Sequence, residues 1–301
     1  MIHSKTDLPA LLDAFKQYLS TEDASSNTTH AYLSDIGHFI TWYIRNVQAF
    51  MIGEITPTDI RAYREFLQEQ VPPAAPATIN RRLAALRRFF VWTKEHQFTE
   101  AQPAERIRNV ASIEHGPKSL DRKQWYRLQR CVEQARGVQG IRDRCIVVLL
   151  YHTGLRAGEL AGVRLDDLVL GERSGHLHVR RGKGNKARRV PLNSEARTAA
   201  RDYLHVRPAC QVQQLFVGQR YEPLSAHAIY DVVVKYARLA GLDDVSPHTL
   251  RHSFARALLA AGTPLTDVAD LLGHSSLDTT RIYTRASETD LAAVVARLEN
   301  T

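Results

Sequence analysis

Apolar residues recur at helical spacing along most of this 301-residue chain. Near the start, Leu8, Leu11, Phe15 and Leu19 lie on one helix face, because each is three or four positions from the next. A second stripe of the same kind runs from residue 32 to residue 43. Side chains on a strand alternate between two faces, so this spacing cannot form one buried strand face. The pattern therefore predicts a mainly α-helical protein.

Local start and stop signals divide the first hundred residues into separate helices. Thr56 followed by Pro57 is typical of a helix start. Proline has no backbone N–H, and this costs nothing in the first turn because N–H groups there have no partner within the helix. Asn27 or Thr28 is the expected cap of the preceding helix. Three prolines within residues 71–76 break the helical pattern and predict a loop.

One stretch in the second half indicates strands. Segments 167–170, 176–180 and 187–192 are short and strand-like, and the last two flank the turn Gly182-Lys183-Gly184-Asn185. Two extended runs around such a turn predict a β-hairpin. The helical pattern returns from Ser194 onward. We therefore expect a mainly α fold with a small β-sheet or hairpin, in which a helical N-terminal domain precedes an α+β domain.

The length of the chain suits two domains. Residues 106–119 contain Gly116-Pro117 and lack strong periodicity, so we expect the interdomain linker there. The expected domains are residues 1–105 and residues 120–301.

The charge balance favours an anionic partner. Forty Lys and Arg against 32 Asp and Glu give a formal net charge of +8. No apolar run approaches the roughly 18 residues of a membrane span, and the start lacks a signal peptide's apolar core. We expect a cytoplasmic protein without membrane contact. The three cysteines fit neither a disulfide framework nor a zinc site, so reduced thiols and no metal are expected. They are Cys131, Cys145 and Cys210.

The helix expected after the loop at residues 71–76 ends at Gln102-Pro103 and carries a basic face. Leu83, Leu86 and Phe90 cluster on one side, and Arg81 and Arg88 lie nearly opposite them. This face is either a solvated surface or a contact with the DNA backbone, and the segment alone does not choose between them. Its basic residues are Arg81, Arg82, Arg87 and Arg88.

The expected hairpin is also strongly basic. Residues 180–189 contain six basic side chains and no acidic one. Such a hairpin repels itself unless an anionic partner is present, and Lys183 between two glycines can extend toward a phosphate. The alternative is a solvated surface loop. The basic residues are Arg180, Arg181, Lys183, Lys186, Arg188 and Arg189.

Two further segments have the outline of a phosphate site. His248 and Arg251 project from one face near a helix N-terminus, where backbone N–H groups favour an anion. A plain surface pair is the alternative. Arg156 occupies a turn, and Glu159 three residues later could hold its guanidinium group. Here the alternative is an Arg–Glu pair that only orders the turn.

These segments, taken in order, resemble the tyrosine recombinase (phage integrase) family. The similarity covers residues 120–290 and includes His274 in a Leu-Leu-Gly-His-Ser-Ser block, with Tyr283 nine residues later. Residues 78–92 resemble the helical, SAM-like core-binding domain of that family, and together the two domains imply a C-shaped DNA clamp. The chain begins at that domain, which favours a two-domain Xer-like or resolvase type. The implied catalytic set is Arg156, Lys183, His248, Arg251, His274 and Tyr283.

The resemblance implies a role for each of these residues. Tyr283 would attack a DNA phosphodiester and form a 3′-phosphotyrosine, so no ATP, metal or other cofactor is needed. Arg156 and Arg251 would neutralise the phosphate oxygens, while Lys183 would protonate the leaving 5′-oxygen. His248 would assist proton transfer at the tyrosine. His274 would hydrogen-bond the phosphate, and Glu159 would support the site without reacting.

The resemblance also implies partners. Strand exchange needs two duplexes and four cleavages, which implies a homo-tetramer on double-stranded DNA with inverted-repeat core sites. These residues do not decide whether a partner recombinase or an accessory protein is also required. An apolar stripe in residues 286–301 packs either on a neighbouring subunit or on its own domain. The competing hypotheses are a non-catalytic DNA-binding relative, a type IB topoisomerase and a helical repressor. Integration, excision and resolution are not distinguished by these residues.

Overall fold

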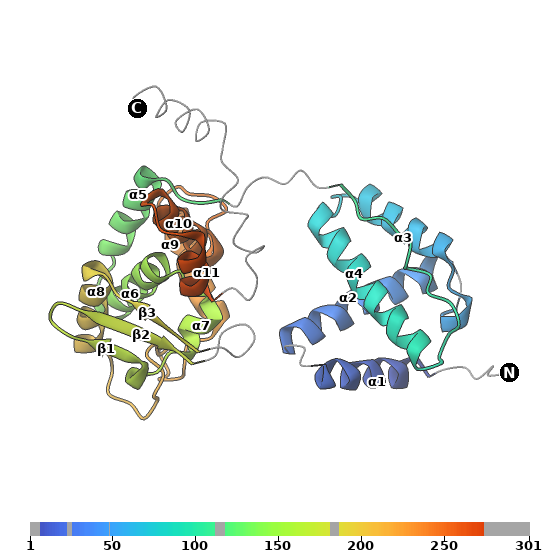
Figure 1. Cartoon of the computed structure of the whole chain (residues 1–301), viewed down its shortest axis with the longest axis horizontal. Coiled ribbons are helices and arrows are strands. Elements are labelled where there is room, and N and C mark those ends of the chain that lie inside the picture. Colours follow the sequence, from blue (N-terminus) through green and yellow to red (C-terminus); the bar gives the residue numbers. More distant parts are fainter. Residues whose placement is uncertain (1–6, 23–25, 48, 112–117, 181–186, 274–301) are drawn as a thin grey trace, which may run out of the picture. The chain divides into compact units, whose positions relative to one another are not determined.

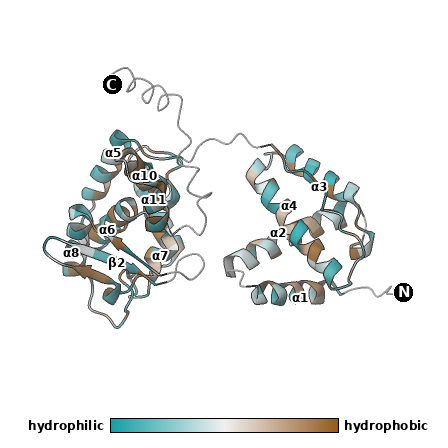
Figure 2. Cartoon of the chain, viewed as in Figure 1, coloured by the Kyte–Doolittle hydropathy of each residue, from teal (hydrophilic) through white to brown (hydrophobic). Residues whose placement is uncertain are grey.

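The computed structural model describes residues 7–22, 26–47, 49–111, 118–180 and 187–273. The chain forms two compact units, residues 1–114 and 115–301, and each has its own hydrophobic core (Figure 1). Hydrophobic residues gather between the helices of each unit, and hydrophilic residues line the outer turns (Figure 2). In the described ranges, no helix has the length and apolar content that crossing a membrane requires.

The N-terminal unit is built from helices alone over its described residues. Its core is rich in aromatic rings, including Phe15, Phe39, Tyr63 and Phe90, all almost completely buried. The rings meet at edges and tilted faces, which adds to the burial of apolar area. The elements are α1 (Leu8–Thr21), α2 (Ser26–Asn46), the 3-10 helix η1 (Ile52–Glu54), α3 (Pro57–Glu69) and α4 (Pro76–Glu95).

Local signals predicted two helix starts in this unit, and one of them is confirmed. Helix α3 begins at Pro57, and Thr56 and Asp59 cap it by reciprocal side-chain to backbone hydrogen bonds. Helix α2 begins at Ser26, so the expectation that Asn27 or Thr28 caps it is wrong. Both residues lie inside the first turn, where backbone N–H groups have no intrahelical partner and polar residues are well tolerated.

The segment after α4 packs back on the N-terminal unit. Ile107 is buried in its core, and the Val110 N–H donates to Asn80 Oδ1 at 2.8 Å. Asn80 Nδ2 in turn donates to the Val110 carbonyl at 3.0 Å. The first residues of the stretch expected as a linker therefore belong to this unit. The sequence pattern did not indicate this packing, because it depends on single apolar side chains and one side-chain amide and not on the repeating apolar positions of a helix.

The C-terminal unit surrounds one buried helix. Residues 145–150 of α6 are all buried, and α6 packs against α5, α8, α9 and α10. Cys145 is within this run, while the other two cysteines are half-buried free thiols. The helices are α5 (Arg122–Glu133), α6 (Gly137–Thr153), α7 (Ala157–Gly162), η2 (Leu165–Asp167), α8 (Ser194–Val206), α9 (Ala226–Leu239), α10 (Pro247–Ala260) and α11 (Leu265–Leu272).

A three-stranded antiparallel sheet lies beside these helices, in the order β1-β2-β3. Its strands are β1 (Leu168–Leu170), β2 (Gly175–Val179) and β3 (Arg188–Pro191). The antiparallel pairing of β2 with β3 confirms the two expected arms of the hairpin, and the predicted turn at residues 182–185 lies outside the described residues. Leu177 faces Leu168 on one side and Val190 on the other. The predicted mainly α fold with a small sheet is thereby confirmed.

Candidate active site

The turn between α6 and α7 brings Arg156 beside α10. Gly154 ends α6 with a φ of 63°, and a Cβ there would lie 2.5 Å from Phe254 Cδ1 and 2.8 Å from Leu272 Cδ2. A left-handed backbone and close neighbours both require glycine at this position. The turn therefore packs directly on α10 and α11.

Arg156 is fixed by Glu159, as its spacing suggested. Arg156 Nη1 donates to Glu159 Oε1 at 2.9 Å, and the Arg156 backbone N–H donates to Oε2 at 2.9 Å. The Glu159 side chain is 5% exposed, whereas that of Arg156 is 26% exposed. The buried Glu159 thus orients Arg156 from the protein side, and the exposed part of the Arg156 guanidinium group can still bind an anion.

Helix α10 supplies the second arginine. Arg251 is 3% exposed, and its Nη1 and Nη2 donate to the carbonyls of Gly154 at 2.6 Å and Leu272 at 2.7 Å. Arg251 Nη1 also lies 4.0 Å from Glu159 Oε2. A plain surface pair is therefore the wrong alternative for this residue, because the fold buries its charge next to Glu159.

Two histidines on α10 lie in the field of these arginines. Partial desolvation, followed by the charges of Arg251 and Arg156, lowers the pKa of His248, which is exposed at the helix start. Burial, followed by His248 and Arg251, lowers the pKa of His252 to about 4. Both imidazoles are therefore neutral at pH 7, and His248 can accept a proton from a group that reaches it.

Arg188 joins the site as well. Its Nη1 and Nη2 donate to Glu159 Oε1 and Oε2 at 3.0 and 2.9 Å, and its Nε donates to the Leu271 carbonyl at 2.8 Å. The side chain is 9% exposed. The guanidinium group of Arg188 thus contacts Glu159 and the Leu271 carbonyl, and the expectation that Arg188 binds DNA stays a prediction.

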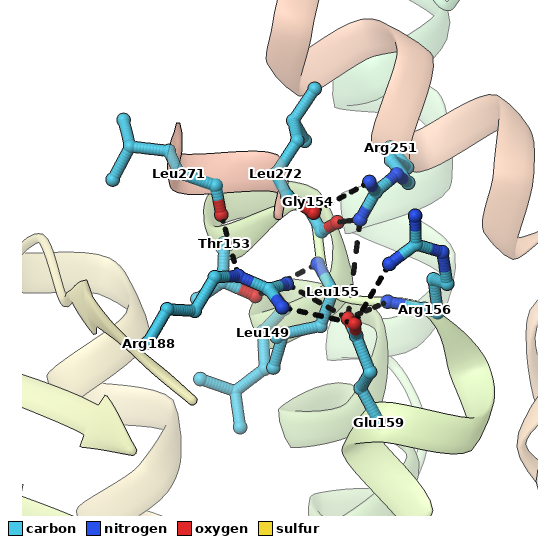
Figure 3. Close-up of polar contacts among 10 residues, drawn as sticks. All are labelled: Leu149, Thr153, Gly154, Leu155, Arg156, Glu159, Arg188, Arg251, Leu271 and Leu272. Carbon is cyan, nitrogen blue, oxygen red and sulfur yellow. Dashed lines mark hydrogen bonds and ion pairs between the residues drawn. The ribbon is translucent and has the colours of Figure 1, made fainter. Parts of the chain in front are cut away.

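Figure 3 shows the resulting cluster, in which Arg156, Arg188 and Arg251 surround the Glu159 carboxylate. Burial acts to raise the pKa of Glu159, but hydrogen bonds and charges from Arg188 and Arg156 outweigh it, so the net shift is downward. Glu159 is therefore a carboxylate at neutral pH. Three positive charges against one negative charge leave the cluster at +2, which suits a phosphodiester.

The strand alternation of β3 carried a signal for Arg188. Val190 is buried two residues later, so Arg188 shares its inward face, while Arg189 between them is exposed. Alternation along β3, counted from the apolar Val190, predicts that Arg188 faces inward and Arg189 faces outward. The expectation based on charge alone treated the two arginines alike.

The arginines of α4 also have partners within their unit. Arg81 and Arg82 are ion-paired with the buried Asp35, and Arg82 Nη1 lies 3.2 Å from His38 Nε2. These contacts fix both side chains, although Arg81 stays half-exposed.

Further along α4, Arg87 Nη2 donates to the Ile107 carbonyl at 2.6 Å and to Asn109 Oδ1 at 2.8 Å. It thereby holds the segment after the helix. Arg88 Nη2 is paired with Glu22 Oε2 at 2.9 Å and stays partly exposed.

At the end of β2, Arg180 is paired with Asp166 at 2.8 Å and with Asp167 at 2.6 Å. The remaining sequence-predicted residues lie outside the described part of the chain. They are Arg181, Lys183, Lys186, His274 and Tyr283. Among the described residues, no group of three or more His, Cys, Asp or Glu side chains is placed to hold a metal ion.

Family models match both units. Residues 118–290 match the phage integrase family, and residues 12–97 match the N-terminal SAM-like domain of phage integrases. Tyrosine recombinase XerD of Lacticaseibacillus casei is 34% identical over 291 residues, which cover 94% of this chain and 96% of that protein. Tyrosine recombinase XerA of Pyrococcus furiosus is 33% identical over 305 residues, with coverage of 99% and 98%.

Solved structures show the same fold. The structure of the XerH site-specific recombinase bound to a palindromic difH substrate, a post-cleavage complex, matches with a TM-score of 0.75. The match covers 96% of this chain and 84% of that chain at 22% identity. Fold, site and relatives together define a site-specific recombinase. The chain belongs to the phage integrase family, the tyrosine recombinases, which confirms the resemblance found in its motifs.

Proposed function

We propose that the chain cuts and rejoins DNA strands at specific sites through a 3′-phosphotyrosine intermediate. One observation carries this proposal: Arg156 and Arg251, 95 positions apart in the chain, meet on the same buried carboxylate. Two guanidinium groups held this rigidly can bind the two non-bridging oxygens of one scissile phosphate. Charge that develops on those oxygens in the transition state is then stabilised without reorganisation of the site.

The chemistry divides into two balanced steps. In the first, the Tyr283 hydroxyl oxygen attacks phosphorus, the bond from phosphorus to the 5′-oxygen breaks, and a free 5′-hydroxyl leaves. His248 assists removal of the tyrosine proton, and Lys183 gives a proton to the 5′-oxygen. In the second, a 5′-hydroxyl attacks phosphorus and gives its proton to Lys183, the bond from phosphorus to the tyrosine oxygen breaks, and His248 assists return of a proton to Tyr283. His274 hydrogen-bonds the phosphate throughout, and the phosphodiester bond energy is conserved without ATP or a metal.

Recombination follows when the attacking 5′-hydroxyl comes from another duplex. One such exchange between two duplexes gives a Holliday junction, and a second resolves it. We infer a homo-tetramer on double-stranded DNA with inverted-repeat core sites. A second recombinase or an accessory protein joins this assembly in those reactions that require one. The N-terminal unit also binds DNA, and the protein works in the cytoplasm.

Several basic side chains are proposed to contact DNA phosphates outside the reacting centre. Arg189 is exposed on the outer face of β3, and Arg81 and Arg88 retain exposed surface on α4. Arg181 and Lys186 belong to the same set by sequence. Their contacts would fix the register of the duplex without reading its sequence.

Trapping of the covalent intermediate tests the proposal. The protein and its Tyr283→Phe variant are incubated with labelled fragments from around its own gene, which carry nicks that let the cleaved strand escape. A protease-sensitive, slowly migrating band on a denaturing gel, absent with the Phe variant, is expected. Retention of DNA without a covalent band would favour a binding protein. Cleavage without recombinant products from a two-site plasmid would favour the topoisomerase alternative.

A further inference from the structure

Within the described part of the chain, the strongest contact of Glu159 is made by a residue outside the catalytic set. Arg188 donates two parallel hydrogen bonds to the two oxygens of Glu159, whereas Arg156 donates one from its side chain and Arg251 approaches to 4.0 Å. A bidentate Arg–carboxylate pair is the strongest form of this interaction. Arg188 is therefore the principal counter-ion of Glu159.

The burial of Glu159 makes this counter-ion important. A carboxylate that is 5% exposed has little help from water, so its charge must be balanced by neighbouring cations. Without Arg188, the cations left near Glu159 among the described residues are Arg156 and Arg251. These two guanidinium groups would then have to balance the carboxylate by themselves, and the net charge of the cluster would fall from +2 to +1.

We propose that Arg188 is a positioning residue that neutralises Glu159 and so leaves the charges of Arg156 and Arg251 available to the scissile phosphate. This inference rests on the proposed function, since it concerns the rate of the same strand cleavage. Arg188 acts through Glu159 and the two arginines rather than by touching DNA. Its 9% exposure and its inward contacts through Nε, Nη1 and Nη2 support that distinction.

Arg188 also connects two parts of the site that are distant in sequence. Its Nε bond to the Leu271 carbonyl ties the start of β3 to the C-terminal turn of α11, where free carbonyls and the helix dipole favour a cation. Gly273 fits closely against it, because a Cβ there would lie 2.7 Å from Arg188 Nη1. In the sequence, β3 follows Lys183 and Leu271 precedes His274. One guanidinium group thus fixes the described ends of both segments.

Four variants test the proposal on the nicked fragment that the trapping experiment identifies. Arg188→Lys retains the charge, Arg188→Met removes it, and Glu159→Gln removes the carboxylate charge. The double variant Glu159→Gln/Arg188→Met removes both charges and returns the cluster to +2. Arg144→Met is the matched control, because Arg144 forms an ion pair with Asp202 between α6 and α8. The measured quantities are the single-turnover cleavage rate at saturating protein and the DNA affinity at several salt concentrations.

We expect Arg188→Met to slow cleavage by about tenfold to a hundredfold, as for residues that orient a catalytic group. Arg188→Lys should lose no more than about threefold to fivefold. The double variant should cleave faster than Arg188→Met, because the uncompensated carboxylate is gone. DNA affinity and its salt dependence should stay at the wild-type values in all four variants, and Arg144→Met should leave the cleavage rate unchanged.

Two results would overturn the inference while leaving the proposed function in place. One is independence of the two substitutions: Glu159→Gln would slow cleavage by the same factor in the Arg188→Met protein as in the wild-type protein. The other is a loss of DNA affinity and a smaller salt dependence in Arg188→Met, which would identify a phosphate contact. If the wild-type protein forms no covalent complex on DNA that it binds, the proposed function itself fails. Thermal melting of each variant separates these results from unfolding.

Discussion

Arg251 and Gly154 are joined by a 2.6 Å hydrogen bond from the buried guanidinium group to the backbone carbonyl. The two residues are 97 positions apart, so this bond fixes α10 against the turn that carries Arg156. A second bond, to the Leu272 carbonyl, fixes α10 against the end of α11. The site is therefore held where α10, the end of α11 and the turn between α6 and α7 meet.

Replacement of Arg251 by lysine should disable the site although the charge is kept. One ammonium group cannot donate to both carbonyls and also face a phosphate with a planar fork. We expect Arg251→Lys to lower the cleavage rate by about a hundredfold or more. The free energy of unfolding should fall by about 1 to 3 kcal/mol, because a buried carbonyl loses its donor. Single-turnover trapping and urea unfolding measure the two effects, and near wild-type cleavage would contradict this assignment.

Gly154 and Gly158 provide a matched pair of glycine substitutions. Gly154→Ala should destabilise the protein by about 1 to 3 kcal/mol, because φ is positive and Phe254 Cδ1 lies 2.5 Å from the new methyl group. Gly158→Ala meets nothing within 4 Å and lies in α7, so it should be neutral or stabilise by up to about 1 kcal/mol. Urea unfolding of both variants checks the prediction. Equal effects would show that neither backbone strain nor crowding matters at Gly154.

The stability of the catalytic unit should decrease in mild acid because of His252. Burial lowers the pKa of its imidazole to about 4, below the ordinary value of 6.5 that holds in the unfolded chain. Between these values the unfolded state binds a proton that the folded state does not. The stabilising contribution is therefore complete above pH 6.5 and is lost as the pH falls toward 4. The slope should reach about 1.4 kcal/mol per pH unit.

Unfolding by urea between pH 7 and pH 4.5 measures this slope, and His252→Gln should flatten it. His248 is the control on the same helix. It is exposed, so its replacement by Gln should change the slope less. An unchanged slope in His252→Gln would assign the acid sensitivity to other groups.

The two neighbouring arginines of β3 should respond differently to salt. Arg189 is exposed, and its replacement by Met should reduce the slope of log affinity against log salt by about 1, as expected for one lost phosphate contact. Arg188 is buried against Glu159, so Arg188→Met should leave the slope unchanged. Titration of a labelled duplex at several salt concentrations measures both. The reverse outcome would place Arg188 rather than Arg189 at the DNA.

Features set by neighbouring residues could be predicted from the sequence. The start of α3 depends on Thr56, Pro57 and Asp59, which lie within four consecutive residues, and the structure has the expected cap. The hairpin depends on alternation around a short glycine-containing turn. The Arg156–Glu159 contact spans one helical turn, so its geometry is nearly fixed once α7 forms. The family motifs likewise identified the class of protein before any contact was known.

The partners of the charged groups were decided by the tertiary structure. Arg188 and Arg189 have the same side chain, yet the side of β3 on which each lies places Arg188 beside Glu159 and leaves Arg189 in solvent. Ile107 lies in a stretch without periodicity and is nonetheless buried. Most helices, the paired strands β2 and β3 and the family could be predicted from the sequence, because those signals act over a few residues. Which arginines face a phosphate and which support another residue depends on contacts between distant segments, and only the folded chain brings these together.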